Sequence, residues 1–443
     1  MAQGLVPALA LAFVACSDPG VAAYVGAQVF DGTDAVIDSA VILVSQGHIV
    51  AIGPAGSVEV PRGATVLRLD GRWIIPGLID GHAHADEATV ATYLSYGVTS
   101  VRHVGGNLER LTSLGARIAL DSIPGPRLFI AGEALTGDPP VWPGQIVLNS
   151  PADAGPAVAR LAAAGVSQVK LYTHTTGELL DAVVQAARTH GLPVTAHLGR
   201  VDAFTAAQLG VASIEHLSGI VEATVKDPSR YYAAHEHFPT GWMTFLRGWA
   251  GLDSAALEKT AAALAETRVI MVPTLVQSET YARLLDTTYA RGLDLSAVSA
   301  EEQRAWDLPD LIARYAITPA DVPLLQRSRE KQDLFLRRFV ARGGKVVAGS
   351  DSPNQLLVAG TSLHEEIALL VRAGFTPQQA LVSATRAAAE LLRADSIGII
   401  RPGAVADFVV LAGSPLDDIQ NIRRIALVVA RGRDHFPEEL RKR

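Results

Sequence analysis

Hydrophobic positions in the middle of the chain form short β-branched runs that alternate with alanine- and leucine-rich stretches of helical spacing. This alternation is typical of a parallel sheet whose strands are joined by crossover helices. Eight candidate strands occur at residues 73–80, 97–104, 127–131, 167–173, 192–196, 211–215, 268–275 and 345–350. They predict a (β/α)8 TIM barrel over residues 73–397. An open doubly wound sheet is the alternative, but the turn after the first strand lacks the Gly-x-Gly-x-x-Gly of a dinucleotide site.

The two ends of the chain have a different pattern, in which short apolar runs are punctuated by glycines and Asp-Gly turns. Residues 22–72 contain GAQVFDG, SAVILVSQGHIVAIG and ATVLRLDG, and residues 398–443 contain GAVADFVVLAG and IALVVARGR. Two β-rich ends flanking one long section predict a small β-sandwich domain built from both chain ends. The expected fold class is therefore α/β, a TIM barrel with this second domain.

Two connections within the expected barrel are long, near residues 220–265 and 278–342, and both contain helical stretches. Long connections after barrel strands usually cover the active-site face. The aromatic residues of the first connection either line a substrate pocket or pack between the added helices. These residues are Tyr231, Tyr232, Trp242 and Trp249.

The chain begins with a short apolar run, LVPALALAFVAC at residues 5–16, followed by a polar turn. It resembles the hydrophobic part of an export signal and is too short to span a bilayer. The run ends in a sequence that looks like a bacterial lipoprotein processing site at Cys16, although the basic start of an export signal is missing. We expect residues 1–21 to be an export signal or lipoprotein-type leader, and the protein to be periplasmic, secreted or lipid-anchored through Cys16. A frayed apolar N-terminus on a cytoplasmic protein is the alternative.

Charge and cysteine content narrow the function classes. The 443 residues carry a net charge of -7 and show no concentrated basic face, which argues against a nucleic-acid partner and favours a small-molecule substrate. Cys16 is the only cysteine, so the chain has neither an internal disulfide nor a thiolate metal cluster. Any transition metal must be held by nitrogen and oxygen. The sequence is compatible with a homo-oligomer.

The first candidate site residues follow the first expected barrel strand, in IIPGLIDGHAHAD. Residues two apart on an extended chain point to the same side, so His82 and His84 can face one ion. An isolated His-x-His is weak evidence, because surface histidines often have this spacing. Its position strengthens the interpretation, since catalytic groups of a barrel gather at the ends of its strands.

Lys170 lies in the fourth expected strand, in SQVKLYTH. A lysine in an apolar strand has a high desolvation cost unless it is paired, modified or functional, although its amine can also reach solvent at the strand end. Tyr172 lies on the same face and His174 just beyond. This strand end can therefore supply both a metal ligand and substrate contacts.

Three further candidates end later strands: His197 in LPVTAH, His216 in VASIEH and Asp351 in KVVAGSDSP. Imidazole is a common nitrogen ligand of zinc, and a carboxylate there can bind metal and accept a proton. Taken alone, each histidine could equally be a buried core residue instead of a metal ligand. Asp351 could instead be the N-cap of the next helix. Their recurrence at strand ends favours a metal site. The pair in His235-Glu236-His237 falls in an insertion and is read as solvated, and His364-Glu365-Glu366 as the start of a helix.

The ordered series of these residues resembles the amidohydrolase superfamily, particularly its imidazolonepropionase-like dipeptidases and prolidase-type hydrolases. The resemblance covers nearly the whole chain. It includes PGLIDGHAH, GVTSVRHVGG, IEHLSG, AGSDSP, LHEEIALLVRAGFTP, ATRAAAELL and PGAVADFVVLAGSPLDDI.

The resemblance implies two divalent metal ions, most simply Zn2+, with carbamylated Lys170 as the bridging ligand. One ion would be held by His82, His84 and Asp351, and the other by His197 and His216. It also implies that a metal-bridging hydroxide attacks the amide carbonyl of a dipeptide or N-acyl amino acid. Asp351 would transfer the proton and Tyr172 would stabilise the oxyanion. The candidates for substrate binding are His174, Arg200 and His103.

Two loops depart from the family's pattern, and both are expected to face the substrate. The chain has Val101-Arg102-His103 where relatives commonly have Val-Arg-Asp, and AGEALTGDPPVWPGQ near residues 131–145 where many have Gly-Gly-His. The leaving-group preference therefore stays open. Alternatives to amide hydrolysis are an ester, lactone or cyclic-amide hydrolase, a mononuclear deaminase or imidazolone-type hydrolase, and a barrel without catalysis.

Overall fold

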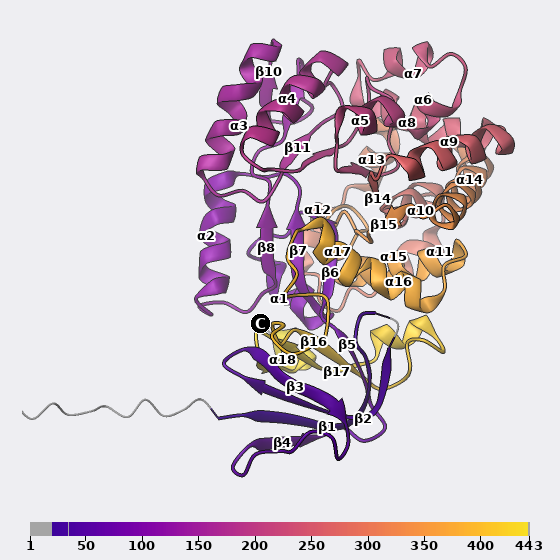
Figure 1. Cartoon of the computed structure of the whole chain (residues 1–443). Coiled ribbons are helices and arrows are strands. Elements are labelled where there is room, and N and C mark those ends of the chain that lie inside the picture. The colour runs from indigo at the N-terminus through magenta and orange to yellow at the C-terminus, as the bar shows by residue number, and fades with distance from the viewer. Residues whose placement is uncertain (1–19, 34, 442–443) are drawn as a thin grey trace, which may run out of the picture.

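In the computed structural model, which describes residues 20–33 and 35–441, strands from both ends of the chain form one sheet (Figure 1). Its order is β18-β17-β16-β5-β1-β2-β3, with β4 also paired to β1. The strands are β1 (Ala22–Phe30), β2 (Val36–Ser45), β3 (His48–Pro54), β4 (Thr65–Arg68), β5 (Trp73–Pro76), β16 (Phe408–Leu411), β17 (Ile425–Ala430) and β18 (Arg433–His435).

This sheet curls around an apolar core of its own. The first half of β1 pairs with β4 and its second half with β5, so the sheet changes partner along one strand. Tyr24 in β1 donates a hydrogen bond of 2.6 Å to Asp434 in β18, although β5, β16 and β17 lie between them in the strand order. Where the sequence predicts a sandwich of two sheets, the structure has one continuous, curled sheet.

The middle of the chain forms two parallel sheets. The first, in the order β6-β7-β8, comprises β6 (Leu78–Ala83), β7 (Val98–His103) and β8 (Arg127–Ile130). The second, in the order β10-β9-β11-β12-β13-β14-β15, comprises β9 (Leu135–Gly137), β10 (Ile146–Leu148), β11 (Val169–Leu171), β12 (Val194–Ala196), β13 (Ser213–Glu215), β14 (Ile270–Val272) and β15 (Lys345–Val346). The α/β class with parallel sheets and an additional domain agrees with the sequence prediction.

Backbone hydrogen bonds join both edges of the three-stranded sheet to the seven-stranded one. Beyond β8, the amide of Ser167 donates to the carbonyl of Ile130 at 2.9 Å. Beyond β6, the amide of Asp351 donates to the carbonyl of His82 at 2.7 Å. The segment after β15 therefore lies directly beside the end of β6, which brings Asp351 next to the His82-x-His84 pair.

The candidate strand at residues 73–80 is divided between two sheets. Its first part, β5, pairs with β1 and β16, and β6 begins the parallel sheets after Gly77. A side chain on Gly77 would overlap Thr99, so only glycine lets the chain cross at this point. β9 and β10, which lie in the Pro- and Gly-rich stretch before Asn149, are additional short strands that the hydrophobic pattern does not reveal.

Helices cover the outer faces of the parallel sheets (Figure 1). α4 shows why they form: Thr176 caps its first turn and one stripe of Leu and Val side chains packs inward. The helices are α1 (Val90–Ser95), α2 (Leu108–Ala119), α3 (Ala154–Ala163), α4 (Gly177–Thr189), α5 (Ala203–Leu209), α6 (Ile220–Thr224), α7 (Ser229–Ala234), α8 (Phe238–Gly248), α9 (Ser254–Glu266), α10 (Leu275–Arg283), α11 (Thr287–Arg291), α12 (Ala300–Ala305), α13 (Leu308–Arg314), α14 (Val322–Ala341), α15 (Thr361–Arg372), α16 (Pro377–Ser383), α17 (Arg386–Leu391) and α18 (Pro437–Leu440).

Both long connections are helical, as their sequences predict: α6 to α9 occupy the first, and α10 to α14 span most of the second. Trp242, Trp249 and Tyr231 of the first connection are buried. No helix within the described ranges has the length and apolar character needed to cross a membrane. The expected leader falls almost wholly outside the described residues, as does Cys16.

Candidate metal centre and active site

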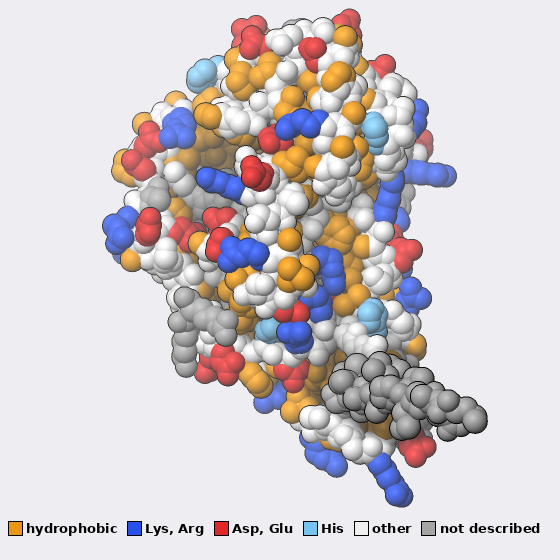
Figure 2. Space-filling view, turned by 90° about the vertical axis from the view of Figure 1, so that its left-hand side faces the viewer, with side chains coloured by type: hydrophobic (Ala, Val, Ile, Leu, Met, Phe, Trp, Pro, Cys, Tyr) orange, Lys and Arg blue, Asp and Glu red, His pale blue; other side chains and the backbone are white. Residues whose placement is uncertain are grey.

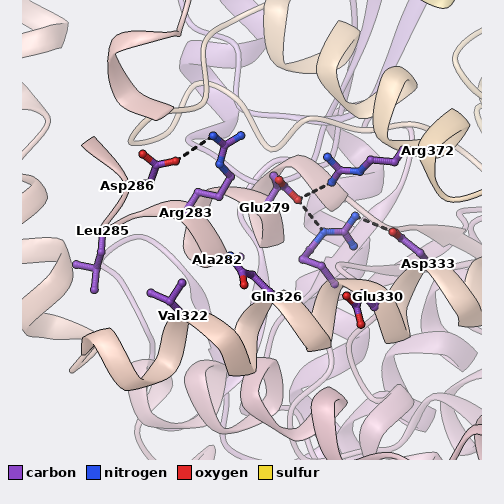
Figure 3. A pocket seen from close by; sticks show the side chains of 11 residues that line it. Glu279, Ala282, Arg283, Leu285, Asp286, Val322, Gln326, Glu330, Asp333 and Arg372 are labelled. Carbon is purple, nitrogen blue, oxygen red and sulfur yellow. Dashed lines mark hydrogen bonds and ion pairs between the residues drawn. The ribbon is translucent and has the colours of Figure 1, made fainter. Parts of the chain in front are cut away.

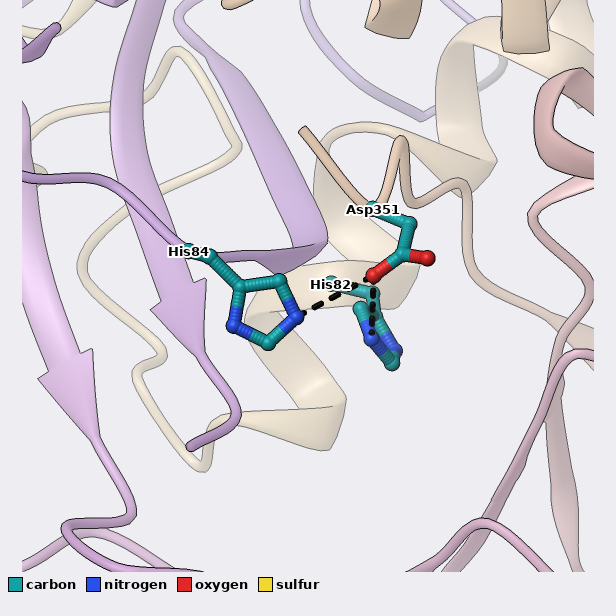
Figure 4. A group of neighbouring side chains, drawn as sticks. All are labelled: His82, His84 and Asp351. Carbon is teal, nitrogen blue, oxygen red and sulfur yellow. Dashed lines mark hydrogen bonds and ion pairs between the residues drawn. The ribbon is translucent and has the colours of Figure 1, made fainter. Parts of the chain in front are cut away.

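His82, His84 and Asp351 form a compact group at the junction of the two parallel sheets (Figure 4). Each offers one ligand atom, and these atoms lie within 4.8 Å of one another. Oδ1 of Asp351 is 3.2 Å from Nε2 of His82 and 3.1 Å from Nε2 of His84. Two ligands of one tetrahedral zinc ion lie about 3.3 Å apart. The spacing and the donor types therefore fit a divalent metal ion.

Three histidines are each fixed through Nδ1, which leaves Nε2 as the ligand atom. Nδ1 of His82 lies 2.5 Å from Oε2 of Glu215, and Nδ1 of His84 lies 3.3 Å from the carbonyl oxygen of Gly105. Nδ1 of His216 lies 2.7 Å from the hydroxyl of Thr274. Metal-binding histidines usually have such a partner on the second nitrogen, because it fixes the ring and its tautomer.

Lys170 and His197 extend the group on the side of β11 and β12. The ring of His197 lies 4.6 Å from that of His216, whose ring is 4.5 Å from that of His82. The amine of Lys170 and both ring nitrogens of His197 are buried and have no hydrogen-bond partner among the described residues. Buried polar atoms without partners are rare in native proteins, so these donors fit an absent ligand.

Burial sets the protonation of these groups. It lowers the pKa of the Lys170 amine to about 8, against the attraction of Glu215. Burial also holds the pKa values of His197 and His216 well below their usual range, and neighbouring cationic groups act in the same direction. Neutral imidazole is the metal-binding form, so the low pKa values favour binding.

Asp351 remains ionised although it is buried. Burial opposes its charge, but hydrogen bonds with His82 and His84 outweigh it and hold the pKa of the carboxyl well below its usual value. Its second oxygen accepts a hydrogen bond from the side-chain amide of Gln277 in α10. Asp351 is thus an oriented carboxylate that can bind a cation and exchange a proton.

Sequence reasoning missed the buried pair of Arg102 and Glu215. Arg102 donates to Glu215 at 3.0 Å and to Ser213 at 2.8 Å, while Glu215 also accepts from Thr195. The charge of Arg102 is the main influence that opposes burial and keeps the pKa of Glu215 low. A charged residue inside an apolar strand was the available signal, in VASIEH and VTSVRH. Gln277 and Thr274 carried no such signal.

Tyr172 belongs to an aromatic surface next to the candidate ligands. Its ring lies 4.7 Å from that of His197 and 5.6 Å from that of Phe238. Burial, together with the charge of Asp351, raises the pKa of its hydroxyl well above the usual value, so the hydroxyl stays protonated. It is therefore available as a hydrogen-bond donor.

The three expected substrate contacts lie around this site in different settings. His103 is buried at the end of β7, with its ring 5.7 Å from that of His84, and burial lowers its pKa to about 3. His174 is also buried, and its Nδ1 lies 2.5 Å from the carbonyl oxygen of Pro139. Arg200 is half-buried after β12 and has no ion-pair partner among the described residues.

The two sequences set aside as decoys have mixed outcomes. His237 is exposed, as expected, but the solvated interpretation is wrong for His235, which is buried with Nε2 3.8 Å from Glu222. Burial arises because α7 and α8 fold this histidine against Gly241 and Gly199. His364 lies in the first turns of α15, as predicted, and its Nε2 is 2.8 Å from the carbonyl oxygen of Tyr96.

A cavity of about 990 Å³ opens beside the candidate metal group. His84 and His103 line its inner end, and residues of α2, including Arg110 and Arg117, line its outer wall. A second cavity of about 590 Å³ lies between α10 and α14 (Figure 3). Its charges are largely paired with one another, as in Arg329 with Glu279 and Asp333. We assign the second cavity a structural role, since ion pairs already occupy its arginines.

Acidic and basic side chains are interspersed over one face of the molecule (Figure 2). On that face neither sign of charge forms a continuous strip.

The model of the Amidohydrolase family matches residues 73–433, which is most of the chain. The protein therefore belongs to the amidohydrolase family, as its motifs predict, and members of this family are generally metal-dependent hydrolases.

Two sequence relatives match short segments. An adenine deaminase from Paracoccus denitrificans (strain Pd 1222) is 29% identical over 96 residues, 20% of this chain and 16% of that protein. An imidazolonepropionase from Pseudomonas entomophila (strain L48) is 44% identical over 59 residues, 13% of this chain and 15% of that protein.

Solved structures match over nearly the full length at low sequence identity. A bottromycin amidohydrolase has a TM-score of 0.74 at 23% identity, covering 96% of this chain and 89% of that one. A Xaa-Pro dipeptidase with bound methionine in the active site has a TM-score of 0.66 at 21% identity, covering 94% and 100%. An A. niger ochratoxinase has a TM-score of 0.67 at 17% identity, covering 94% and 95%. These similarities show that the chain shares the fold of these three proteins. The chain spans only about a sixth of the sequence relatives' length.

Proposed function

We propose that this protein cleaves the amide bond of a dipeptide or an N-acyl amino acid at a two-metal centre. The observation that carries this proposal is that Lys170 and His197 have buried nitrogen atoms with no hydrogen-bond partner in the described part of the chain. These atoms lie directly beside the group of His82, His84 and Asp351. Such donors at the ends of parallel strands are suited to metal-assisted hydrolysis.

The proposed scaffold is a closed (β/α)8 barrel. Hydrogen bonds at both edges of the three-stranded sheet support this arrangement, as does the full-length similarity to amidohydrolase structures. In such a barrel the chemistry takes place at the carboxyl ends of the strands. Four candidate ligands follow strands: His84 follows β6, His197 follows β12, His216 follows β13 and Asp351 follows β15. The other two, His82 and Lys170, lie within β6 and β11.

In this proposal His82, His84 and Asp351 hold one divalent ion, and His197 and His216 hold the other. Lys170 lies between the two sets. Two bound ions, most simply Zn2+, would supply a hydroxide near neutral pH and polarise the substrate carbonyl. Glu215, Thr274 and the carbonyl of Gly105 keep three of the histidines in their binding orientation.

Lys170 is proposed to react with carbon dioxide. The nitrogen lone pair forms a bond to carbon, one carbonyl electron pair moves to oxygen, and the nitrogen loses a proton, which gives a carbamate anion. Only the neutral amine has this lone pair, and burial lowers the pKa of Lys170 to about 8. The reaction replaces a buried cation among histidines with an anion that has two ligand oxygens.

Asp351 is the proposed proton carrier. Its ionised carboxylate accepts the proton of the attacking nucleophile and then returns it to the leaving nitrogen. Gln277 holds one carboxylate oxygen, so the other faces the histidines. Tyr172 donates a hydrogen bond to the oxyanion that develops on the carbonyl.

Substrate recognition is proposed to involve Arg200, His174 and His103. The guanidinium group of Arg200 can bind a substrate carboxylate in a bidentate manner. His103 borders the large cavity beside His84 and can contact the group that occupies it.

A second candidate is imidazolone-type hydrolysis at a centre with a single metal ion. It is favoured by the segment that is 44% identical to an imidazolonepropionase, although that segment covers only 15% of the relative. This reading requires one metal ion and an unmodified Lys170, so counting bound metal separates the two candidates.

The test is amino-acid release from a library of dipeptides and N-acyl amino acids by zinc-loaded protein, with chelator-treated protein and Asp351→Asn as controls. Release that depends on both the metal and Asp351 supports the proposal. Silence across the library, with hydrolysis of an ester, lactone or cyclic amide, overturns it.

We also propose that the protein is exported, and lipid-anchored if Cys16 is modified. Fractionation of cells that express the full chain, with Cys16→Ala as the comparison, tests this part independently of the chemistry. Recovery of the full chain in the cytoplasm without processing contradicts it.

A further inference from the structure

Trp142, in the connection between β9 and β10, lies beside Tyr172. Their ring centroids are 4.2 Å apart and their planes meet at 74°. Trp142 nevertheless remains 38% exposed, although tryptophan is a large apolar residue. Because Tyr172 also contacts His197 and Phe238, Trp142 extends an aromatic surface from the candidate metal ligands outwards.

The connection that carries Trp142 is fixed at both ends. At its start, His174 lies with Nδ1 2.5 Å from the carbonyl oxygen of Pro139. At its end, the side chain of Gln145 accepts hydrogen bonds from the amides of Val141, at 2.7 Å, and Trp142, at 3.4 Å. The backbone that carries the exposed ring is therefore held in place before any ligand binds, which reduces the entropy cost of binding.

Trp142 offers an exposed aromatic face to any ligand bound near the candidate metal ligands. The half-buried rings of Tyr172 and Phe238 and the ring of Trp142 carry no net charge. Aromatic rings prefer edge-to-face or offset contacts with other rings, and burial of apolar surface adds to the attraction. The ligand group suited to this surface is itself aromatic or large and apolar.

We propose that Trp142, Tyr172 and Phe238 form an aromatic clamp that selects substrates with an aromatic or large apolar side chain next to the scissile amide. This inference rests on the proposed hydrolase function and names its substrate class. The clamp uses the loop in which this chain departs from the Gly-Gly-His pattern of many relatives, so it gives that departure a function. His174 serves the clamp as a positioning residue, through Pro139.

The first test compares kcat/KM for Phe-Ala, Ala-Phe and Ala-Ala, and for N-acetylphenylalanine and N-acetylalanine. The wild-type protein is expected to prefer a phenylalanine substrate over its alanine counterpart by at least about tenfold. Trp142→Ala should reduce this ratio about tenfold, and Trp142→Phe should retain most of it. Phe436→Ala, which removes another exposed aromatic ring, is the matched control and should leave the ratio unchanged.

A wild-type ratio near one, or a ratio that Trp142→Ala does not change, overturns the clamp. If the protein hydrolyses none of these five compounds, the clamp is judged by binding, and the library experiment decides the proposed amide hydrolysis separately. Calorimetric titration of the metal-loaded protein with L-phenylalanine and L-alanine then decides. Tighter binding of phenylalanine that is lost in Trp142→Ala supports the clamp, and equal affinities overturn it.

Discussion

Glu215 holds His82 by its Nδ1 atom, with 2.5 Å between the carboxylate oxygen and the ring nitrogen. The other ring nitrogen, Nε2, is thereby turned towards Asp351. Arg102 balances the charge of Glu215 from the opposite side. An ion pair buried in the strands therefore orients one of the candidate metal ligands.

Replacement of Glu215 by glutamine should weaken metal binding by about 10- to 100-fold, because partners behind metal-binding histidines typically contribute that much. Metal affinity is measured by competition with a chromophoric chelator. Glu390→Gln is the control, since Glu390 forms an exposed ion pair with Lys345 at the start of β15. Unchanged metal affinity in Glu215→Gln would show that the anchoring of His82 is unimportant.

Lys170→Ala should lower hydrolysis at least about a hundredfold and reduce the bound metal, because loss of a ligand costs no less than loss of its partner. Lys170→Arg should not restore activity, since a guanidinium group does not form the carbamate. Metal-free protein reloaded with zinc in carbon dioxide-free buffer should regain activity only after bicarbonate is added. Full reactivation without bicarbonate would contradict the carbamate.

Gln277→Ala should lower kcat about tenfold with little change in KM, because it removes only the hydrogen bond that orients Asp351. Steady-state kinetics on the preferred substrate measure the two constants separately. Gln326→Ala, at the cavity between α10 and α14, is the matched control. A rise in KM at constant kcat would instead make Gln277 a substrate-binding residue.

The stability of the fold should depend on Glu366. This buried carboxyl accepts a hydrogen bond from the amide of Val276 at 2.8 Å, and burial raises its pKa to about 8. Because the pKa is raised in the folded state, the contribution to stability is complete below the unfolded pKa of about 4.5 and is lost as pH rises towards 8. The resulting decrease in the free energy of unfolding amounts to at most about 5 kcal/mol.

Chemical unfolding between pH 5 and pH 8 checks this dependence. Glu366→Gln should flatten the decline in the free energy of unfolding, whereas Glu365→Gln, at an exposed neighbour, should not. Equal slopes for the wild type and Glu366→Gln would show that Glu366 is already ionised in the folded protein.

Much of the architecture follows from the hydrophobic pattern. Short apolar runs that alternate with helical stretches locate the strands that carry Lys170, His197 and His216, because each strand is buried on both faces. The order of these strand ends also predicts that His82 and Asp351 meet, since parallel strands align their carboxyl ends. The hydrophobic pattern does not predict the division of the strand at Gly77, nor does it predict β9 and β10. Segments of three or four residues are too short to show a hydrophobic period.

The roles of His174 and Glu215 depend on contacts between residues far apart in the sequence, which the sequence does not show. His174 is a candidate for substrate binding by position, yet its Nδ1 faces the carbonyl of Pro139, a contact across 35 residues. Glu215 precedes the candidate ligand His216, and its sequence context predicts only a position in an apolar strand. In the structure its carboxylate contacts Arg102 and His82. Which charged strand residue binds metal and which supports a ligand depends on the rotation of each strand in the sheet.

The most direct test of the account is a titration of metal-free protein with zinc, in the presence of bicarbonate, with bound metal per chain and dipeptide hydrolysis measured on the same samples. We expect hydrolysis to rise in step with the second zinc ion and to disappear in Lys170→Ala. Full hydrolytic activity with one metal ion per chain, or activity that survives removal of all metal, would contradict a two-metal amide hydrolase.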